Sequence, residues 1–397
     1  MHSSAQSTHA SIERPSAALG PFSAPARVNL IGEHTDYTGG LVLPMAIHFT
    51  TSALISPRED GIYSVSSDAF EDARVISVDD HTEASKHWSD YPIGVLIKLQ
   101  EHGVKPPAFS LSLRGNVPLG SGLSSSASVE VASALAMLAF SGAELTAKEI
   151  AILCRRAENE FVHSPCGIMD QFVILEAMAG HALMLNTQTL DYEHVPMNLG
   201  GLRTCKIVII NSRVKHSIAG GDYGLRRREV EAGQSAIRAR FPGTQYLGEA
   251  SLIQLETCAA DMPSESFRRC RHILSENLRV RGAREAMLVG NPGRFGELML
   301  AFHASMRDDF ACSCDEIDFL VNTAAGLAGC YGARMTGGGF GGCTVNLVDQ
   351  SSSEEFGRTI GQAYQSRFGL EPEIYVCAAA DGALRSNGAR FLKLVGE

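Results

Sequence analysis

The sequence predicts a soluble, mixed α/β protein with more than one domain, on three observations. Its 397 residues exceed the length of one average domain, which is about 150 residues. Hydrophobic residues make up 45% and charged residues 20% of the chain, as is typical of globular proteins. Hydrophobic patterns of period two, typical of strands, alternate along the chain with patterns of helical period.

The first half begins with strand patterns and continues with helices. Trp88 to Glu101 has a helical period, and Phe109 to Leu113 then returns to the alternation of a strand. Ala127 to Phe140 has almost no polar face, so we expect a helix that is buried on most sides. Thr146 and Glu149 form the pattern of a capping box, which predicts a helix that continues to Val162. Four earlier strands are expected at 41–47, 50–55, 63–67 and 73–78.

Helical patterns dominate the second half, between a few strands. The helices are expected at 223–240 and 265–289, and the strands at 205–211, on both sides of a loop within 332–348, and at 373–379. The shift in pattern near residue 200 predicts domains at 23–200 and 201–397. We expect residues 1–22 to be a flexible leader, because they are rich in Ser, Ala, His and Pro and lack the apolar core of a secretory signal. The pattern leaves open whether the last strand returns to the first domain.

The charge and the cysteines restrict the class of partner and the compartment. With 34 Lys and Arg against 44 Asp and Glu, the formal net charge is −10, which argues against nucleic acid as a partner. No apolar run approaches the roughly 20 residues that span a membrane. The ten cysteines are too dilute for a disulfide scaffold and form no Cys-x-x-Cys pair, which indicates a reducing compartment. We therefore expect a cytoplasmic protein.

A serine- and glycine-rich turn, Pro118 to Ser126, lies between a predicted strand and the predicted buried helix. Unpaired backbone N–H groups at a helix N-terminus favour an anion, and serine hydroxyls add donors or a ligand for Mg²⁺. The turn therefore predicts a phosphate-binding loop without the lysine of a P-loop. A serine-rich cap that serves only the helix is the alternative.

Two further segments concentrate polar groups. Pro25 to Tyr37 places one arginine, two carboxylates and an imidazole around Gly32, a density that suits a ligand with many hydroxyl groups. Cys166 to Gln171 places Asp170 within an apolar run, where a carboxylate is costly unless it is paired, and Arg27 is an available partner. The third unusual segment, Gly337 to Gly342, matches G-x-G-x-x-G, but a strand follows it where a nucleotide-binding turn would begin a helix.

These segments resemble known motifs in order and spacing. Pro25 to Tyr37, the serine-rich turn and Met335 to Gly342 resemble the three signature motifs of the GHMP small-molecule kinases. Within them, Pro25 to Tyr37 and Gly167 to Gln171 are similar to the galactokinase family. The resemblance extends from about Pro25 to the C-terminus. It implies a ribosomal-S5-like N-terminal domain and a ferredoxin-like C-terminal domain, with the active site in the cleft between them.

The resemblance also implies a reaction and a set of site residues. The reaction is transfer of the γ-phosphate of ATP to the C1 hydroxyl of D-galactose, with Mg²⁺ bound, and the small molecules D-galactose and MgATP would be the partners. Asp170 would be the catalytic carboxylate with Arg27 as its cationic partner. The remaining expected residues fall into three groups: sugar-binding Glu33, His34, Thr35, Asp36, Gly167 and Tyr223; nucleotide-binding Ser67, Trp88, Gly120, Ser121, Gly122, Leu123, Ser124, Ser125 and Ser126; and the Mg²⁺ ligands Ser126 and Glu158. Tyr91 also matches a position near the nucleotide, and the glycine-rich segment would support the phosphate pocket from the second domain.

Three alternatives stay open at this point. Asp170 either accepts the proton of the C1 hydroxyl as a general base or only orients that hydroxyl while Arg27 stabilises charge on the phosphoryl group. A kinase of the same type for galactosamine, N-acetylgalactosamine or arabinose would carry nearly the same motifs. A sensor that binds sugar and ATP and signals through a protein partner is the third, although it would not need the complete set of Arg27, Asp170, Ser126 and Glu158.

Overall fold

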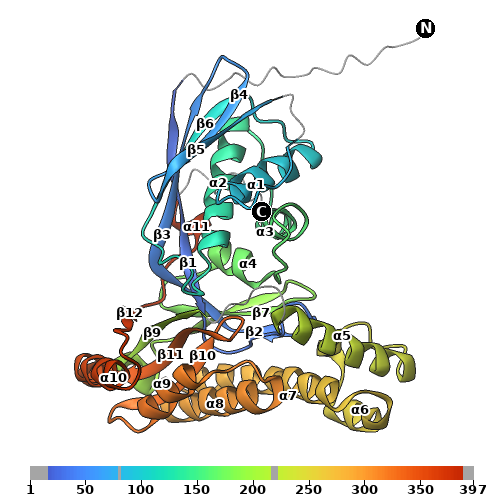
Figure 1. Cartoon of the computed structure of the whole chain (residues 1–397), viewed down its shortest axis with the longest axis vertical. Helices are drawn as coiled ribbons and strands as arrows, with labels where there is room; N and C mark the ends of the chain where they lie inside the picture. Colours follow the sequence, from blue (N-terminus) through green and yellow to red (C-terminus); the bar gives the residue numbers. More distant parts are fainter. Residues whose placement is uncertain (1–16, 79–81, 216–221, 388–397) are drawn as a thin grey trace.

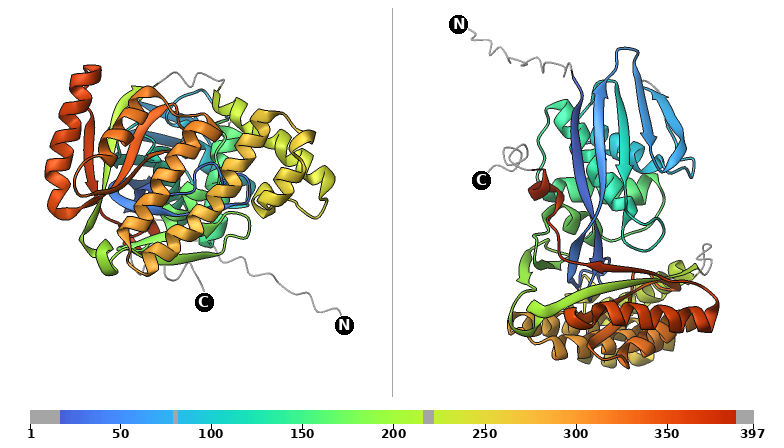
Figure 2. Two further views of the ribbon diagram at one scale, coloured as in Figure 1. Left: turned by 90° about the horizontal axis from the view of Figure 1, so that it is seen from below. Right: turned by 90° about the vertical axis from the view of Figure 1, so that its left-hand side faces the viewer.

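The computed structural model describes residues 17–78, 82–215 and 222–387, and they form two lobes (Figure 1). The first lobe is a five-stranded sheet with helices on one face. The second lobe is a four-stranded sheet packed on a layer of helices. A small three-stranded sheet lies where the lobes meet, and the second view in Figure 2 shows the long first strands running down into this junction. The mixed α/β fold expected from the sequence is confirmed.

The sheet of the first lobe has the strand order β1-β3-β6-β4-β5. All neighbours are antiparallel except β4 and β6, which are parallel. The expected strands at 41–47 and 50–55 are largely one continuous strand, β3, and the expected leader ends earlier than residue 22 because β1 already pairs with β3 from Leu19. Residues 1–16 of that leader lie outside the described residues. The strands are β1 (Leu19–Asn29), β3 (Pro44–Pro57), β4 (Ile62–Ser67), β5 (Phe70–Ser77) and β6 (Phe109–Gly115).

Four helices cover one face of this sheet. The most central is α2 (Ser125–Ser141), whose side chains are almost all buried, as its apolar sequence predicts. Thr146 caps α3 (Ala147–Arg156) through the expected capping box with Glu149. A single π-helical turn, η1 (Ala157–Phe161), prolongs α3 and carries Glu158. The other two are α1 (Asp90–Glu101) and α4 (Met169–Glu176).

The second lobe contains an antiparallel sheet of order β10-β11-β9-β12. Alternate residues of β9 face opposite sides: Val208 and Ile210 pack against the outer helices α9 and α10, whereas Ile207 and Ile209 belong to the central core. The last strand, β12, pairs with β9, so it does not return to the first lobe. The chain returns only after it, where the Ala380 N–H donates to the Ala46 carbonyl oxygen. The strands are β9 (Cys205–Lys215), β10 (Cys330–Thr336), β11 (Gly341–Asp349) and β12 (Glu373–Cys377).

The central core joins the two lobes. It contains residues of β1, β2 and β3 together with residues of α7, α8 and the second sheet, so the halves of the sequence share one apolar cluster. The junction sheet is β2 (Leu41–Val42), β7 (His181–Asn186) and β8 (Tyr192–Pro196). The remaining helices are α5 (Asp222–Arg240), α6 (Leu252–Thr257), α7 (Ser264–Leu288), α8 (Pro292–Ser305), α9 (Asp315–Ala325), α10 (Ser353–Phe368) and α11 (Ala383–Ser386). Short helical turns are η2 (Gly200–Thr204), η3 (Leu247–Glu249), η4 (Ala259–Asp261), η5 (Met306–Phe310) and η6 (Gln350–Ser352).

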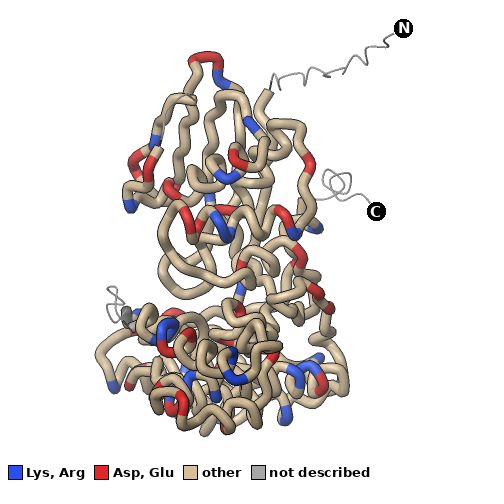
Figure 3. Tube along the Cα trace, turned by 90° about the vertical axis from the view of Figure 1, so that its right-hand side faces the viewer, with Lys and Arg blue, Asp and Glu red and all other residues tan. Residues whose placement is uncertain are grey.

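The surface carries both signs of charge. Figure 3 shows acidic and basic positions interspersed over both lobes, which agrees with the modest negative net charge. Within the described part of the chain, no helix combines the length and the apolar character that crossing a membrane requires.

Candidate active site between the two lobes

Arg27 and Asp170 form the central ion pair of the site. Arg27 lies near the end of β1 and Asp170 in the first turn of α4, where the helix dipole favours a carboxylate. Arg27 Nε donates to Asp170 Oδ1 and Nη2 to Oδ2, each at 2.7 Å. Burial opposes the charge of Arg27, but the pairing with Asp170 outweighs it and raises the Arg27 pKa above its ordinary value. The pairing expected from the sequence is confirmed.

The same pair also touches the serine-rich turn. Arg27 Nη1 donates to the Gly122 carbonyl oxygen at 2.7 Å, and the Ser124 hydroxyl donates to Asp170 Oδ2. Ser124 has φ = 60°, a left-handed conformation that is unfavourable for a residue with a Cβ atom. This backbone is part of the turn that directs the hydroxyl at Asp170.

The expected phosphate-binding serines therefore differ in what their side chains contact. The Ser121 hydroxyl donates to the Pro118 carbonyl oxygen at 2.7 Å within the turn, and the Ser124 hydroxyl is bonded to Asp170. Ser125 and Ser126, the first residues of α2, line a cavity of about 170 Å³. Gly120 and Gly122 have φ = 66° and 78°, which glycine adopts without strain. Leu123 is buried, and its carbonyl oxygen accepts a hydrogen bond from the Arg27 N–H.

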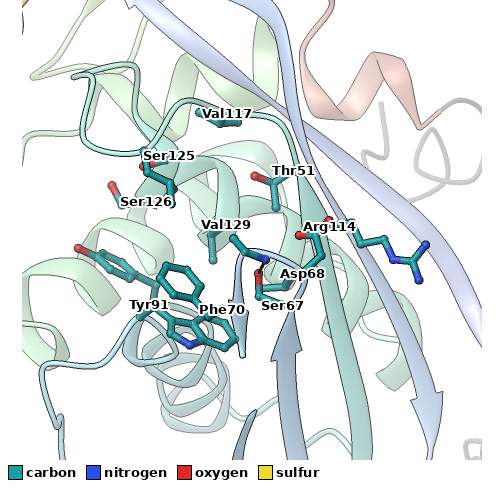
Figure 4. Close-up of a pocket in the computed structure, with 15 residues that line it drawn as sticks. Thr51, Ser67, Asp68, Phe70, Tyr91, Arg114, Val117, Ser125, Ser126 and Val129 are labelled. Carbon is teal, nitrogen blue, oxygen red and sulfur yellow. Dashed lines mark hydrogen bonds between the residues drawn. The ribbon is translucent and has the colours of Figure 1, made fainter. Parts of the chain in front are cut away.

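The cavity beside Ser125 and Ser126 is largely apolar and aromatic (Figure 4). Ser67, Trp88 and Tyr91, expected from the sequence, line it, and so does Phe70, which the sequence analysis missed. The rings of Phe70 and Trp88 stack with centroids 5.2 Å apart and an interplanar angle of 5°. Phe70 begins β5, where nothing in its sequence pattern distinguishes it from an ordinary strand residue. The other lining residues are Thr51, Asp68, Ala69, Leu113, Arg114, Gly115, Val117, Leu119 and Val129.

Arg27 and Asp170 both line a second cavity, of about 120 Å³. Several charged and polar side chains line it, and its wall comes from both lobes, since Gly337 and Gly338 belong to the turn between β10 and β11. Five of the six residues expected to hold a sugar line it, namely Glu33, His34, Asp36, Gly167 and Tyr223. Thr35 does not: it is fully buried, and its hydroxyl donates to the carbonyl oxygens of Gly32 and Leu41 at 2.8 and 2.7 Å.

Asp36 is half-buried and has a strongly perturbed carboxyl group. Burial and then the nearby charge of Asp170 raise the pKa of Asp36 to about 7. A Cβ atom on Gly167 would lie 1.9 Å from Asp36 Oδ2, so glycine is required for this close approach. The wall of this second cavity thus contains a carboxyl group that ionises near neutral pH.

His34 is a neutral imidazole at the same wall. Burial lowers the pKa of His34 to about 3. Its ring stacks on Phe310 with a centroid separation of 4.1 Å, and its Nδ1 lies 3.2 Å from the Tyr37 hydroxyl. The buried Nε2 has no hydrogen-bond partner among the described residues, which leaves it available for a ligand.

Glu33 is held by residues of both lobes. Its two carboxylate oxygens accept hydrogen bonds from Arg334 of β10, from Asn29 Nδ2 at 2.7 Å, from the Thr336 hydroxyl at 2.9 Å and from the Gly337 N–H at 3.1 Å. The sequence analysis missed Arg334, because a single arginine within a strand pattern gives no sign of its partner.

The expected metal ligands, Ser126 and Glu158, lie close together and near the carboxylates of Glu130 and Asp170. Burial and then Asp170 raise the pKa of Glu158 to about 7, although hydrogen bonds from Cys166, Ser126 and Gln171 oppose the shift. Gln171 Nε2 donates to both Glu158 and the fully buried Glu130 at 3.0 Å. A hydroxyl and a carboxylate oxygen are ligands that Mg²⁺ prefers, and a cation there would offset the burial of Glu158. Within the described residues, no three His, Cys, Asp or Glu side chains are arranged to hold a metal by themselves, so phosphate oxygens would have to complete the coordination.

Comparisons with known proteins agree with this geometry. Three family models match: the galactokinase galactose-binding signature at residues 12–57, the GHMP kinases N-terminal domain at 90–177 and the GHMP kinases C-terminal domain at 283–366. The chain is 40% identical to a galactokinase of Roseiflexus sp., over 91% of this chain and 92% of the relative, and 40% identical to the galactokinase of Homo sapiens, over 91% of each. The crystal structure of Lactococcus lactis galactokinase complexed with galactose matches with a TM-score of 0.87 at 33% identity, covering 92% of this chain and 94% of that one.

Proposed function

Because the chain belongs to the galactokinase family, we propose that it transfers the γ-phosphate of ATP to the C1 hydroxyl of D-galactose through the Arg27–Asp170 pair. The chain is an ATP-dependent sugar kinase. The observation that carries the proposal is the place of this pair: Asp170 lines the polar cavity, while the Gly122 carbonyl and the Ser124 hydroxyl tie the pair to the turn that begins α2. The Asp170 carboxylate therefore lines the cavity expected to hold the sugar and is hydrogen-bonded to the turn expected to hold the phosphates.

Asp170 would act on the sugar hydroxyl. The bidentate contact with Arg27 fixes the plane of the Asp170 carboxylate, and Oδ2 also accepts a hydrogen bond from the Ser124 hydroxyl. Asp170 would accept the proton of the C1 hydroxyl or orient that hydroxyl for attack on the phosphoryl group. Arg27 would stabilise the negative charge that the transferring group carries, and both residues act mainly by positioning.

The sugar would be held by groups with different hydrogen-bonding capacity. Ionised Asp36 would accept from two sugar hydroxyls, and the neutral imidazole of His34 would offer its unpartnered Nε2. Tyr223 and Gly167 would complete the wall, together with Glu33, which its hydrogen bonds to both lobes hold in place. Thr35 would support the loop from below through its two bonds to backbone carbonyls.

The nucleotide would occupy the apolar cavity, with its phosphates at the serine-rich turn. The stacked rings of Phe70 and Trp88 supply an apolar wall that suits a purine. The N–H groups at the start of α2 would bind phosphate oxygens. Ser126 and Glu158 would hold Mg²⁺, which neutralises phosphate charge when bound.

The proposal also includes the cellular compartment and the division into domains. The ten cysteines are all free, which is consistent with a reducing compartment and thus with the cytoplasm. The division into domains 23–200 and 201–397 falls at η2, which leads into β9, although the central core contains residues of both.

The test is ADP release from MgATP with a panel of D-galactose, D-galactosamine, N-acetylgalactosamine, L-arabinose and D-glucose. We expect the fastest turnover with galactose, and a loss of about 10²–10⁴-fold in kcat for Asp170→Asn with sugar affinity retained. Glu176→Gln is the matched control, because Glu176 ends the same helix away from the cavity. Binding of galactose without any phosphorylation would favour a sugar sensor. Faster turnover with another sugar of the panel would make that sugar the substrate instead of galactose.

A further inference from the structure

Arg334 is the largest side chain that the structure buries completely. A buried guanidinium group is costly unless it is paired and hydrogen-bonded, so the partners of Arg334 indicate its role. Nη1 donates to Glu33 Oε2 at 2.7 Å and Nη2 to Glu33 Oε1, while Nε donates to the Met335 carbonyl oxygen at 2.6 Å. The guanidinium carbon lies 4.2 Å from the centroid of the Phe302 ring, which covers one face.

We propose that Arg334 is a positioning residue of the sugar cavity, which acts through Glu33 and couples the second lobe to sugar binding. The inference rests on the proposed function only in that the ligand of this cavity is a sugar. Arg334 does not line the cavity itself, whereas Glu33 does. The two residues are separated by 301 positions in the chain, so the pair is a contact that only the assembled lobes can make.

The other partners of Glu33 show what the pair holds together. Asn29 is the last residue of β1, and the Gly337 N–H belongs to the glycine-rich turn whose Gly337 and Gly338 line the cavity. The Glu33 carboxylate, in the loop that follows β1, thus accepts five hydrogen bonds that join this loop to the end of β1 and to β10 and its following turn in the second lobe. A bidentate arginine fixes both the position and the plane of a carboxylate, which a lysine cannot do.

The test compares Arg334→Lys and Arg334→Met with the wild type in two assays. Calorimetric titration with D-galactose in the absence of nucleotide measures sugar affinity, and steady-state kinetics separates the KM for galactose from the KM for ATP. We expect Arg334→Lys to weaken galactose binding about tenfold, because the charge remains and the fork is lost, with the KM for ATP changed less than about twofold. Arg334→Met should weaken galactose binding more than Arg334→Lys does. If Arg334→Met does not fold, the result for Arg334→Lys alone tests the inference.

Two controls separate positioning from a general loss of stability. Arg269→Lys removes the fork of another buried arginine, which pairs with Glu229 at 2.8 Å and contacts no residue of the cavity wall by hydrogen bond. Arg269→Lys should lower Tm about as much as Arg334→Lys does and leave galactose affinity unchanged. In a double-mutant cycle, Arg334→Lys added to Glu33→Gln should cost less galactose affinity than Arg334→Lys alone, because Arg334 acts through Glu33.

Unchanged galactose affinity in Arg334→Lys, an equal loss of galactose and ATP affinity, or full additivity with Glu33→Gln would each overturn the inference. The proposed function fails separately, when the wild type phosphorylates no galactose. In that event, the same variants are titrated with whichever sugar of the panel the wild type binds.

Discussion

Gly167 and Asp36 are so close that a Cβ atom on the glycine would lie 1.9 Å from Oδ2 of the aspartate. Asp36 lies in the loop that follows β1, and Gly167 lies in the turn before α4. The approach places an ionisable oxygen of the first segment against the backbone of the second. It shows how a residue without a side chain shapes the cavity.

Gly167→Ala should therefore displace Asp36 and reduce kcat/KM for galactose about a hundredfold, as a misplacement of about 1 Å in a site can. Steady-state kinetics at saturating MgATP measures the loss. Gly243→Ala is the matched control, because a Cβ atom there meets nothing within 4 Å. Activity of Gly167→Ala equal to that of the control would show that Asp36 has room to move without consequence.

Two substitutions of Ser124 should have the same effect on activity but different effects on stability. Both Ser124→Ala and Ser124→Gly remove the hydroxyl that bonds Asp170, so both should lower kcat. Only glycine relieves the left-handed backbone at φ = 60°, so Ser124→Gly should be more stable than Ser124→Ala by about 1 kcal/mol. Urea denaturation and kinetics on the pair check both parts, and equal stabilities would contradict the strain argument.

Asp36 predicts a pH dependence of sugar binding. Its pKa of about 7 means that the carboxyl group is mostly protonated at pH 6 and mostly ionised at pH 8. Because the ionised form is the better acceptor for sugar hydroxyls, galactose affinity should rise about tenfold from pH 6 to pH 8. His34 adds nothing in this range, since its pKa of about 3 keeps it neutral.

Calorimetry without nucleotide or metal ion measures this dependence, and the Asp36→Asn variant separates it from the titration of Glu158, whose pKa is also raised to about 7. Asp36→Asn should bind galactose more weakly and with no dependence on pH over the same range. An affinity of the wild type that falls as the pH rises would mean that protonated Asp36 donates to the sugar instead.

Glu158 predicts a defect that depends on metal. Glu158→Gln should raise the Mg²⁺ concentration for half-maximal activity by about tenfold or more, because it removes a charged ligand. Glu160→Gln is the control two residues away, where the carboxylate is exposed and pairs with Arg156 and Lys98. A Mg²⁺ titration at fixed ATP checks both variants, and the same half-maximal Mg²⁺ concentration in both would remove Glu158 from the metal site.

Local sequence determined much of this molecule. The buried helix α2, the capping box at Thr146 and the order of strands and helices follow from hydrophobic period and cap chemistry, which act within a few residues. The resemblance also pointed to most of the residues that line the second cavity, but to a minority of those that line the apolar cavity.

Only the tertiary structure decided which partners those residues have. It turned Ser124 toward Asp170 and Thr35 away from the cavity, and it brought Arg334 to Glu33 and Phe70 to Trp88. The contacts of Ser124, Arg334 and Phe70 join separate segments of the chain, whereas those of Thr35 lie within its own loop. The physical reason is that burial makes an unpaired charge or hydroxyl costly, and the assembled lobes determine which distant group satisfies it.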